Sequence, residues 1–373
     1  MPHKHDDLEP LNREPPVTEL ISSFLTRKDG YDRNHGPIPH IDASKHRVRV
    51  EGAVANPLDL SVSQLRHDYP QHTVTCVLQC AGNRRHTMRT LLKEVSGLDW
   101  FDAAVMNCKW SGPRLKDVLA RVGVEVEGEE RTKAHVAFEC RQQICQDDEW
   151  YGGSIGLERA LRESAEVILA LDMNDEPLTP EHGFPVRVVT PGIAGARAVK
   201  WLDRISVQLE ESPNHYQQRD YKVLPEDATD AESAAPYWDK VPALQDMPVN
   251  SVVAVPANGA TVALSSQRTV EVKGYALPAG ESGPVTKVEV SGDDGRTWTE
   301  AKLLSHPDDG KWTWKLWEAM VGLELGSGKR VLSRATDAGG NVQVEKPAWN
   351  LRGVAYNGYG ETRDLTVVEG EET

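Results

Sequence analysis

The stretch "TCVLQCAGNRRHTM", from Thr75 to Met88, joins an apolar run to a sharp turn. The run "HTVTCVLQC" predicts a buried strand that ends in Cys80, because it is apolar, partly β-branched and bounded by turn residues. Arg84 and Arg85 follow the Gly-Asn turn at once. A thiolate is a soft ligand that suits a transition metal, and nearby arginines would lower its pKa and bind an anion. Spacing alone still favours Cys80 as one more buried cysteine.

The five cysteines are scattered, and none forms the paired C-x-x-C pattern of a zinc site. Their odd number does not suggest a disulfide framework, so we expect a reducing, intracellular compartment. The first residues, "MPHKHDDLEP", contain no apolar signal region. The cytoplasm is therefore the expected location, with the mitochondrion and the peroxisome left open.

The net charge of the chain limits the classes of molecule that it is expected to bind. Among 373 residues, Asp and Glu outnumber Lys and Arg, which gives a formal net charge of −15. An acidic chain repels nucleic acid phosphates and anionic membrane surfaces, so we expect neither as a partner. No apolar segment is long enough to span a bilayer. Any local cluster of arginines runs against this balance and calls for an explanation.

Changes in composition and residue pattern along the sequence predict an N-terminal arm followed by two domains. Residues 1–30 form an arm rich in proline and charge, with one short helix expected in "REPPVTELISSFLT". Residues 31–246 mix helical and strand patterns irregularly, which predicts an α+β domain. Residues 247–373 contain short alternating runs separated by Gly, Asp and Ser turns, which predicts a β-sandwich. The alternating tryptophans of "KWTWKLW" cannot all face one core, so we expect some of them at an interface between two copies of the chain. The alternative is that they cover the linker or the surface of the first domain.

Basic residues recur beside glycines and prolines in "RNHGPIP", "HGFPVRVV", "GARAVKW", "RDYK" and "WNLRGV". Each would usually be a solvated surface charge, but together they would suit an anionic cofactor with phosphate or oxo groups. With "LQCAGNRR", these motifs resemble the sulfite oxidase family of molybdenum enzymes, in family order, from about Tyr31 to Val354.

The resemblance implies an α+β domain that binds Mo-molybdopterin, followed by an immunoglobulin-like domain that forms a homodimer. It implies that Cys80 is the protein ligand of molybdenum. It also implies that the pterin and its phosphate contact Tyr31, Asp32, Arg33, Asn34, His35, His182, Arg187, Ala198, Val199 and Lys200.

The activity that the resemblance implies is oxidation of sulfite to sulfate, with two electrons passed to dioxygen or to a separate acceptor such as a cytochrome. The residues expected to act on the substrate are Arg33, Cys80, Arg85, Trp100, Tyr221 and Arg352. Arginines suit this task, because they stay charged and their planar forks match an oxyanion. The metal carries the redox chemistry, and the protein supplies binding, orientation and electrostatics.

Some positions depart from the family pattern. Ser96 stands where a basic residue is usual, so we expect a less positive pocket. Gln142, in the divergent segment 140–150, stands near the place of an acidic pterin contact, and the alignment there is open. About 30 residues precede "YDRNHG", too few for a haem domain, and no flavin domain follows. We therefore expect neither haem nor flavin, as in the plant-type enzyme.

Three other interpretations stay open. A nitrate reductase-type Mo domain shares the fold, but it tends to have Asn where this chain has Tyr221. A non-catalytic dimeric scaffold is disfavoured by the presence of Cys80 and of the pocket arginines. An unrelated thiol enzyme lacks a readable Cys/His pairing.

Overall fold

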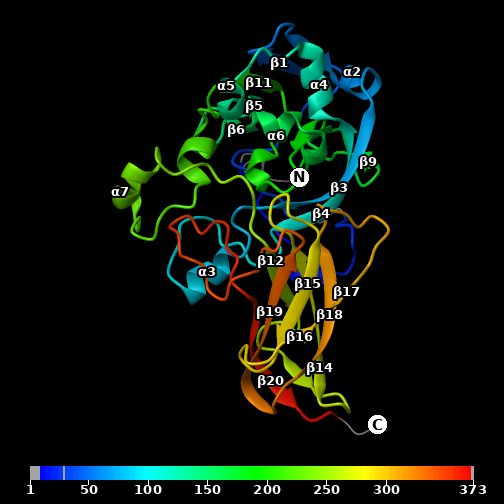
Figure 1. The fold of residues 1–373 in the computed structure, drawn as a ribbon, viewed down its shortest axis with the longest axis vertical. Helices are drawn as coiled ribbons and strands as arrows, with labels where there is room; N and C mark the ends of the chain where they lie inside the picture. The colour runs from blue at the N-terminus through cyan, green and yellow to red at the C-terminus, as the bar shows by residue number, and fades with distance from the viewer. Residues whose placement is uncertain (1–8, 28–29, 371–373) are drawn as a thin grey trace, which may run out of the picture.

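The computed structural model describes residues 9–27 and 30–370. Figure 1 shows a rounded body of mixed sheets and short helices above a narrower body of long strands. This arrangement confirms the predicted α+β fold followed by a β-sandwich. None of the helices in the described part of the chain is long and apolar enough to cross a membrane.

The first body is built on a five-stranded sheet of order β2-β1-β11-β5-β6. In this sheet β1 pairs with β11 in parallel, whereas the other neighbours are antiparallel. Val48 and Val50 of β1 are fully buried and alternate with exposed arginines, as expected for a strand with one covered face. The strands are β1 (Arg47–Gly52), β2 (Leu58–Ser61), β5 (His135–Cys140), β6 (Tyr151–Gly156) and β11 (Arg204–Gln208).

A second sheet of order β3-β4-β8-β9 carries the turn of interest. Its long antiparallel pair, β3 (Gln71–Gln79) and β4 (Val105–Pro113), confirms the predicted buried strand, and Cys80 is the first residue beyond it. Two short strands complete the sheet: β8 (Asp172–Met173) and β9 (Glu176–Pro177). Two further strands of the first body form an antiparallel pair, β7 (Ile168–Ala170) and β10 (Arg187–Val189).

The helices are short. α4 (Leu115–Val122) has one apolar face, on which Leu115, Val118, Leu119 and Val122 are fully buried. It ends at Gly123, whose φ of +68° suits a glycine that closes a helix. The others in this body are α2 (Val62–His67), α3 (Arg85–Leu91), α5 (Glu130–Lys133), α6 (Leu157–Leu161) and α7 (Ala231–Ala234).

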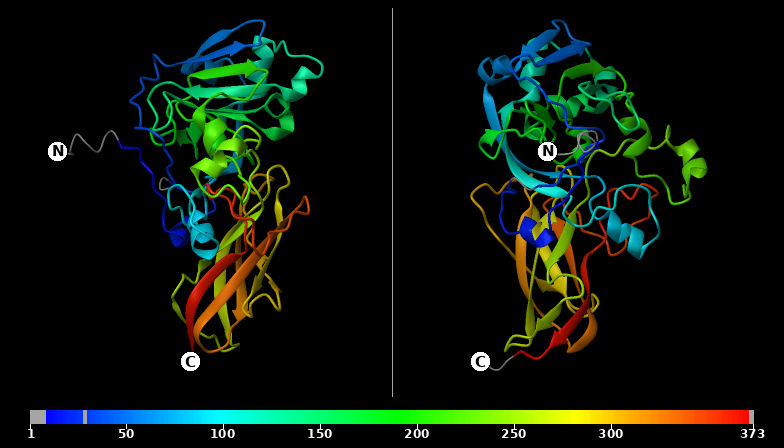
Figure 2. Two further views of the ribbon diagram at one scale, coloured as in Figure 1. Left: turned by 90° about the vertical axis from the view of Figure 1, so that its left-hand side faces the viewer. Right: turned by 180° about the vertical axis from the view of Figure 1, so that it is seen from behind.

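The arm contains the predicted short helix, α1 (Val17–Leu20). Figure 2 shows this segment beside the top of the sandwich, close to the junction of the two bodies. Leu20 and Phe24 belong to one apolar cluster with Trp314, whose indole N–H donates to the Phe24 carbonyl at 2.9 Å. The arm is thus packed onto both bodies.

The second body consists of two facing sheets, of order β12-β14-β18-β17 and β13-β20-β19-β15-β16. Side chains from both inner faces form one core, as in other sandwiches. The strands are β12 (Asn250–Val255), β13 (Thr261–Ala263), β14 (Thr269–Leu277), β15 (Val285–Ser291), β16 (Thr299–Glu300), β17 (Lys302–Leu303), β18 (Lys315–Gly322), β19 (Gly326–Asp337) and β20 (Gly360–Val368).

The tryptophans of "KWTWKLW" do not form a surface for a second copy. Trp312 donates to Glu166 Oε2 of the first body at 2.6 Å, and Trp314 packs on the arm. Trp317 lies in the sandwich core. All three are at most 4% exposed. The expectation that some of them face a partner chain was wrong, because the first body and the arm already cover them.

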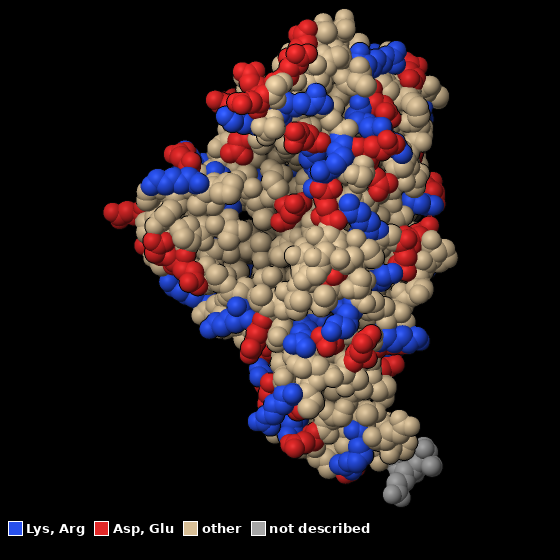
Figure 3. All heavy atoms as spheres, viewed as in Figure 1, with Lys and Arg blue, Asp and Glu red and all other residues tan. Residues whose placement is uncertain are grey.

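Acidic and basic side chains are interspersed over the face of the molecule seen in Figure 3. Many charged side chains of the described chain pair locally, as Arg66 does with Asp172 and Arg204 with Glu51. That face therefore presents no continuous basic surface of the kind that binds nucleic acid.

Candidate active site

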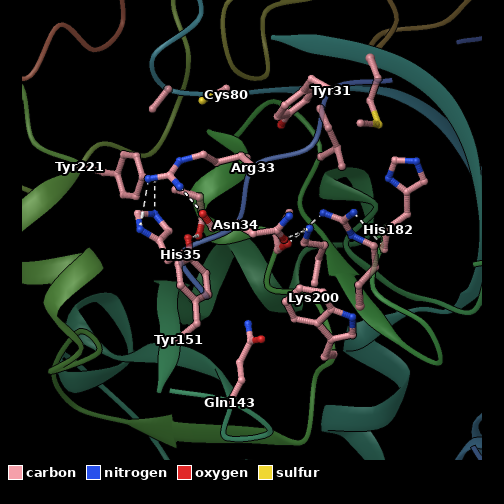
Figure 4. Close-up of a pocket in the computed structure, with 18 residues that line it drawn as sticks. Tyr31, Arg33, Asn34, His35, Cys80, Gln143, Tyr151, His182, Lys200 and Tyr221 are labelled. Carbon is pink, nitrogen blue, oxygen red and sulfur yellow. Dashed lines mark hydrogen bonds between the residues drawn. The ribbon is translucent and has the colours of Figure 1, made fainter. Parts of the chain in front are cut away.

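A pocket opens in the first body at the end of β3 (Figure 4). The space between its walls, part of it open to solvent, is about 700 Å³. Most predicted residues line it: Tyr31, Arg33, Asn34, His35, Cys80, His182, Arg187, Ala198, Lys200 and Tyr221. These residues come from segments far apart in the sequence, which the two sheets and the loops after them bring together.

Cys80 sits at one end of this pocket and is 5% exposed. Its backbone is fixed, because its N–H donates to the Ala104 carbonyl at 2.9 Å and its carbonyl accepts from Asn83 N–H at 3.0 Å. Burial raises the pKa of the Cys80 thiol, while the Arg85 guanidinium and the Gly82 N–H act in the opposite direction. The thiol is thus held rigidly next to groups that favour its thiolate, as a metal ligand requires.

The turn after Cys80 sends the two arginines in different directions. Arg84 adopts a left-handed φ of 65°, and α3 begins at Arg85. The Arg84 guanidinium donates to Asn250 Oδ1 at 2.8 Å and to the carbonyls of Gly358 and Tyr359 at 2.6 and 2.7 Å. Arg84 therefore ties the turn to the sandwich. The carboxylate of Asp102 lies near it, 3.4 Å from Arg84 Nε.

Arg85 is enclosed next to Cys80. A Cβ atom on Gly82 would lie 2.5 Å from its Nη2, and one on Gly353 would lie 2.7 Å from its Cγ. These glycines are required because no side chain fits between the two backbones and the arginine. Arg85 donates to the carbonyls of Leu98 and Arg352 at 2.8 and 3.0 Å and binds no carboxylate in the described chain. Its charge is therefore available to the thiolate or to an anion.

The other expected substrate residues do not line the pocket. Arg352 is paired with Asp220 Oδ1 through its Nε at 3.0 Å, which neutralises much of its charge. Trp100 packs edge-on against Tyr31, with ring centres 6.4 Å apart. The roles expected for Arg85, Trp100 and Arg352 at the substrate remain predictions.

Two residues expected at the pterin also lie behind the wall. Asp32 binds Arg13 Nε at 2.6 Å, and Val199 lies in the core, where its carbonyl accepts from Val188. Each supports a neighbour that does line the pocket. Their expected contacts with the pterin stay predictions.

The opposite wall of the pocket is cationic. Arg187 donates to the carbonyls of His182 and Ala198 at 3.1 and 3.0 Å, and its Nε is buried without a hydrogen-bond partner in the described chain. Burial lowers the pKa of Arg187 to about 10. Burial, reinforced by the charge of Arg187, lowers the pKa of Lys200 to about 7. Lys200 Nζ donates to Asn34 Oδ1 and to the Glu181 carbonyl at 2.5 and 2.7 Å, but neither cation forms an ion pair in the described chain. An anion bound here would relieve their desolvation.

A third group links Arg33, His35 and Tyr221 (Figure 4). Arg33 Nη2 lies 3.1 Å from His35 Nδ1, and His35 Nε2 lies 2.8 Å from the Tyr221 hydroxyl. Because a guanidinium only donates, Nδ1 must accept, and the ring proton on Nε2 points to Tyr221. Burial and then Arg33 lower the pKa of His35 well below its usual value. Burial raises the pKa of Tyr221 to about 12, so its hydroxyl stays neutral.

Several lining residues escaped the sequence analysis. In the divergent segment, Gln142 turns away to bind Asp203 at 2.8 Å, whereas Gln143 lines the pocket. The Oε1 atom of Gln143 is buried without a partner among the described residues. Ser96 is exposed, does not line this pocket and donates its N–H to the Leu351 carbonyl, and the less positive pocket expected from it stays a prediction. The other unpredicted lining residues are Leu78, Ala81, Met106, Tyr151, Gly195, Ala196 and Trp201.

Comparisons with known proteins agree with this geometry. Residues 35–216 match the family described as the oxidoreductase molybdopterin binding domain, and residues 241–363 match the Mo-co oxidoreductase dimerisation domain. Chicken sulfite oxidase is 42% identical over 358 residues, which cover 93% of this chain and 74% of that protein. Arabidopsis sulfite oxidase is 37% identical over 381 residues, covering 95% and 92% of the two chains.

This chain belongs to the sulfite oxidase family. Human mitochondrial sulfite oxidase is also 42% identical, and this chain spans 64% of its length. A barley nitrate reductase is 38% identical over 367 residues, which make up 93% of this chain and 40% of that enzyme. The solved structure of the sulfane dehydrogenase SoxCD from Paracoccus pantotrophus has the same fold, with a TM-score of 0.73 at 22% identity over 96% of this chain and 90% of that one.

The residues in the pocket fit the cofactor that this family implies. Within residues 9–27 and 30–370, no group of three His, Cys, Asp or Glu side chains is arranged to hold a metal ion. A metal bound at Cys80 would thus take its other ligands from the cofactor rather than from the protein. The unpartnered Arg187 Nε and the low pKa of Lys200 suit the negative charge of a pterin phosphate on the opposite wall.

Proposed function

We propose that this protein oxidises sulfite to sulfate with Mo-molybdopterin, and that Cys80 is the protein ligand of the metal. One observation carries the proposal: a rigid buried thiol faces a cationic wall across a single pocket. The family membership and the sulfite oxidase relatives at 37–42% identity support it. When bound, molybdenum supplies the two-electron redox change and the transferred oxygen.

The protein's own residues bind and orient the cofactor and the sulfite. Arg187 and Lys200, beside His182, hold the anionic end of the cofactor in a site that is costly to leave empty. Arg33 offers a sulfite oxygen its remaining N–H groups, and the neutral Tyr221 hydroxyl offers one hydrogen bond without adding charge. Burial strengthens each of these contacts, because little water competes inside the pocket. Water supplies the added oxygen overall, so each sulfite yields sulfate, two protons and two electrons.

We propose that the two electrons leave to dioxygen or to a separate acceptor such as a cytochrome. The test is a steady-state sulfite assay of the molybdenum-loaded protein with dioxygen, ferricyanide or cytochrome c as acceptor. Turnover with at least one acceptor is expected. Full molybdenum content without turnover on any of them would overturn the proposal.

Nitrate is the rival substrate, since the barley nitrate reductase is nearly as similar over this chain. Tyr221 lies in the pocket where nitrate reductases tend to have Asn, which supports sulfite. Nitrate reduction with reduced viologen, compared with sulfite oxidation in the same preparation, decides between them. A protein without bound molybdenum, active on neither substrate, would instead support the non-catalytic scaffold.

We further propose a homodimer formed mainly by residues 247–373, with the boundary of the two domains near Met247. The match of residues 241–363 to a dimerisation domain supports it. Exposed apolar side chains on this body, such as Met320 at 48%, are candidates for the interface. Light scattering at micromolar concentration should give twice the mass of one chain, and the mass of one chain would contradict the proposal. The absence of haem and flavin remains a prediction, which an absorption spectrum of the purified protein checks.

A further inference from the structure

The N-terminal arm contacts the wall of the pocket through residues 11–14, which we call the latch. Arg13 and Asp32 form an antiparallel bridge, with N–H to carbonyl distances of 3.0 and 2.9 Å. Asn34 Nδ2 donates to the Leu11 carbonyl at 2.6 Å, and Asn34 N–H donates to Asn12 Oδ1 at 3.0 Å. The latch therefore binds the same segment, residues 31–35, that lines the pocket. It precedes residue 35, where the match to the molybdopterin binding domain begins.

The latch also contacts the loop that follows Trp100. The carboxylate of Glu14 accepts from the N–H groups of Phe101 and Ala103 at 2.6 and 2.9 Å. These two residues flank the end of the loop that contains Trp100, which packs on Tyr31. Four consecutive residues of the arm thus connect the pocket segment 31–35 with the loop that follows Trp100.

Within the latch, Asn12 contacts a pocket arginine directly. Its Oδ1 accepts from Arg33 Nη1 at 3.1 Å. The other Nη1 hydrogen goes to the Asn34 carbonyl, and Nη2 donates to His35 Nδ1 at 3.1 Å. The Nη1 end of Arg33 is therefore fully committed, which leaves Nε and one Nη2 hydrogen for a bound anion.

All of these acceptors are neutral, since no carboxylate hydrogen-bonds Arg33 in the described part of the chain. The contrast with Arg352 is direct, because that arginine pairs with Asp220. A neutral amide at position 12 fixes the orientation of Arg33 without consuming its charge. A carboxylate there would fix it equally well and would neutralise it.

We propose that Asn12 is a positioning residue that acts through Arg33, so that the arm sets the affinity of the site for oxyanions. The inference rests on the proposed function, in which Arg33 binds sulfite. It predicts that the charge of residue 12, and not only its ability to accept a hydrogen bond, controls anion binding.

The test compares Asn12→Asp with Asn12→Ala in the molybdenum-loaded protein. Asp keeps the shape and the Oδ1 acceptor and loses only the donation from Nδ2 to the Pro10 carbonyl at 3.1 Å, so the melting temperature should stay close to that of the wild type. The KM for sulfite should nevertheless rise about tenfold or more, as should the calorimetric Kd for sulfate, because Asp draws the charge of Arg33 away from the anion. Ala removes the acceptor and should raise both constants less, with some loss of stability.

Asn258→Ala is the matched control, because its Oδ1 also accepts one backbone N–H, from Arg363 at 2.8 Å, but in the sandwich. It should leave both constants unchanged. An Asp variant that binds sulfite and sulfate as the wild type does would overturn the inference, whether or not the Ala variant folds. If the loaded wild type does not turn over sulfite at all, the proposed function fails instead, and the two failures are distinguishable.

Discussion

The two sides of the pocket are built on opposite principles. On the turn side, residues 80–85, protein groups hold both arginines: backbone carbonyls hold Arg85, and the sandwich holds Arg84. Arg84 Nε makes no hydrogen bond in the described chain, but it lies 3.4 Å from the carboxylate of Asp102. On the cationic side, Arg187 Nε has no partner in the described chain, and Lys200 is desolvated until its pKa falls to about 7.

This difference separates two kinds of preorganisation. The backbone of the turn is fixed by hydrogen bonds within the protein, so it can hold a thiolate in a fixed direction before anything binds. The cationic side stores an unfavourable desolvation that a bound anion relieves. The first side should therefore decide the chemistry and the second should decide how tightly an anionic cofactor is held.

Replacement of the thiol tests the turn side most strongly. Cys80→Ser should fold, because the turn is held by backbone hydrogen bonds that the hydroxyl does not disturb. Activity with sulfite should fall by roughly a hundredfold or more, since loss of a ligand exceeds the cost of losing a residue that only supports one. Absorption spectroscopy of the metal-thiolate band is the second measurement. An active serine variant with an unchanged spectrum would refute Cys80 as the ligand.

Arg85→Gln should have the next largest effect. The variant loses a buried charge next to Cys80 and should raise the KM for sulfite by about ten- to a hundredfold at full molybdenum content. Part of the loss should appear in kcat, because a misplaced substrate leaves the reactive geometry. Wild-type kcat and KM in this variant would remove Arg85 from the site.

The neighbouring Arg84→Gln gives the matched contrast. Arg84 bonds the sandwich rather than the pocket, so its loss should lower the free energy of unfolding by on the order of 3 kcal/mol. Its effect on KM should be smaller than that of Arg85→Gln. Denaturant unfolding and steady-state kinetics on both variants would show whether adjacent arginines divide the two tasks.

Lys200 tests the cationic side through pH. In the cofactor-free protein its pKa is about 7 when folded, against an ordinary value of 10.5. Between these values the unfolded chain binds more protons, so stability from this group should rise as pH increases from about 7 to 10.5. Lys200→Met should abolish that rise, whereas Lys302→Met, at an exposed lysine of the sandwich, should retain it. An identical pH dependence in the two variants would show that Lys200 is not desolvated.

Local sequence predicted those parts of the fold that depend on local pattern. The strand before Cys80 and the short helix of the arm both follow from local pattern and turn residues. Most pocket residues were predictable through the resemblance, because they lie in short motifs with charged or polar side chains. Apolar lining residues such as Met106 carry no such signal.

The sequence failed where contacts join distant segments. Nothing in "KWTWKLW" shows that Trp312 meets Glu166 and Trp314 meets the arm. Gln142 and Gln143 are chemically identical neighbours, and only the loop geometry sends one to Asp203 and the other into the pocket. Asn12 was part of an unassigned arm, since its contact with Arg33 spans 21 residues of sequence.

The smallest effect should come from Tyr221→Phe. This substitution tests how much a neutral hydrogen bond contributes to anion binding, compared with a charged one. The substitution removes one hydroxyl that accepts from His35 and faces the pocket, and it changes no charge. Loss of one neutral hydrogen bond should raise the KM for sulfite by about two- to tenfold. Because burial raises the pKa of Tyr221 to about 12, the hydroxyl does not ionise in the working range, and the pH profile should keep its shape.

Tyr69→Phe removes a buried hydroxyl far from the pocket and should leave the KM for sulfite unchanged. If Tyr221→Phe were instead as damaging as Arg85→Gln, anion binding would depend on this hydrogen-bond network as much as on the buried charge. The division between a turn side that decides the chemistry and a cationic side that holds the anionic charge would then be wrong. A neutral hydroxyl linked to Arg33 through His35 would control both the chemistry and the binding of anions.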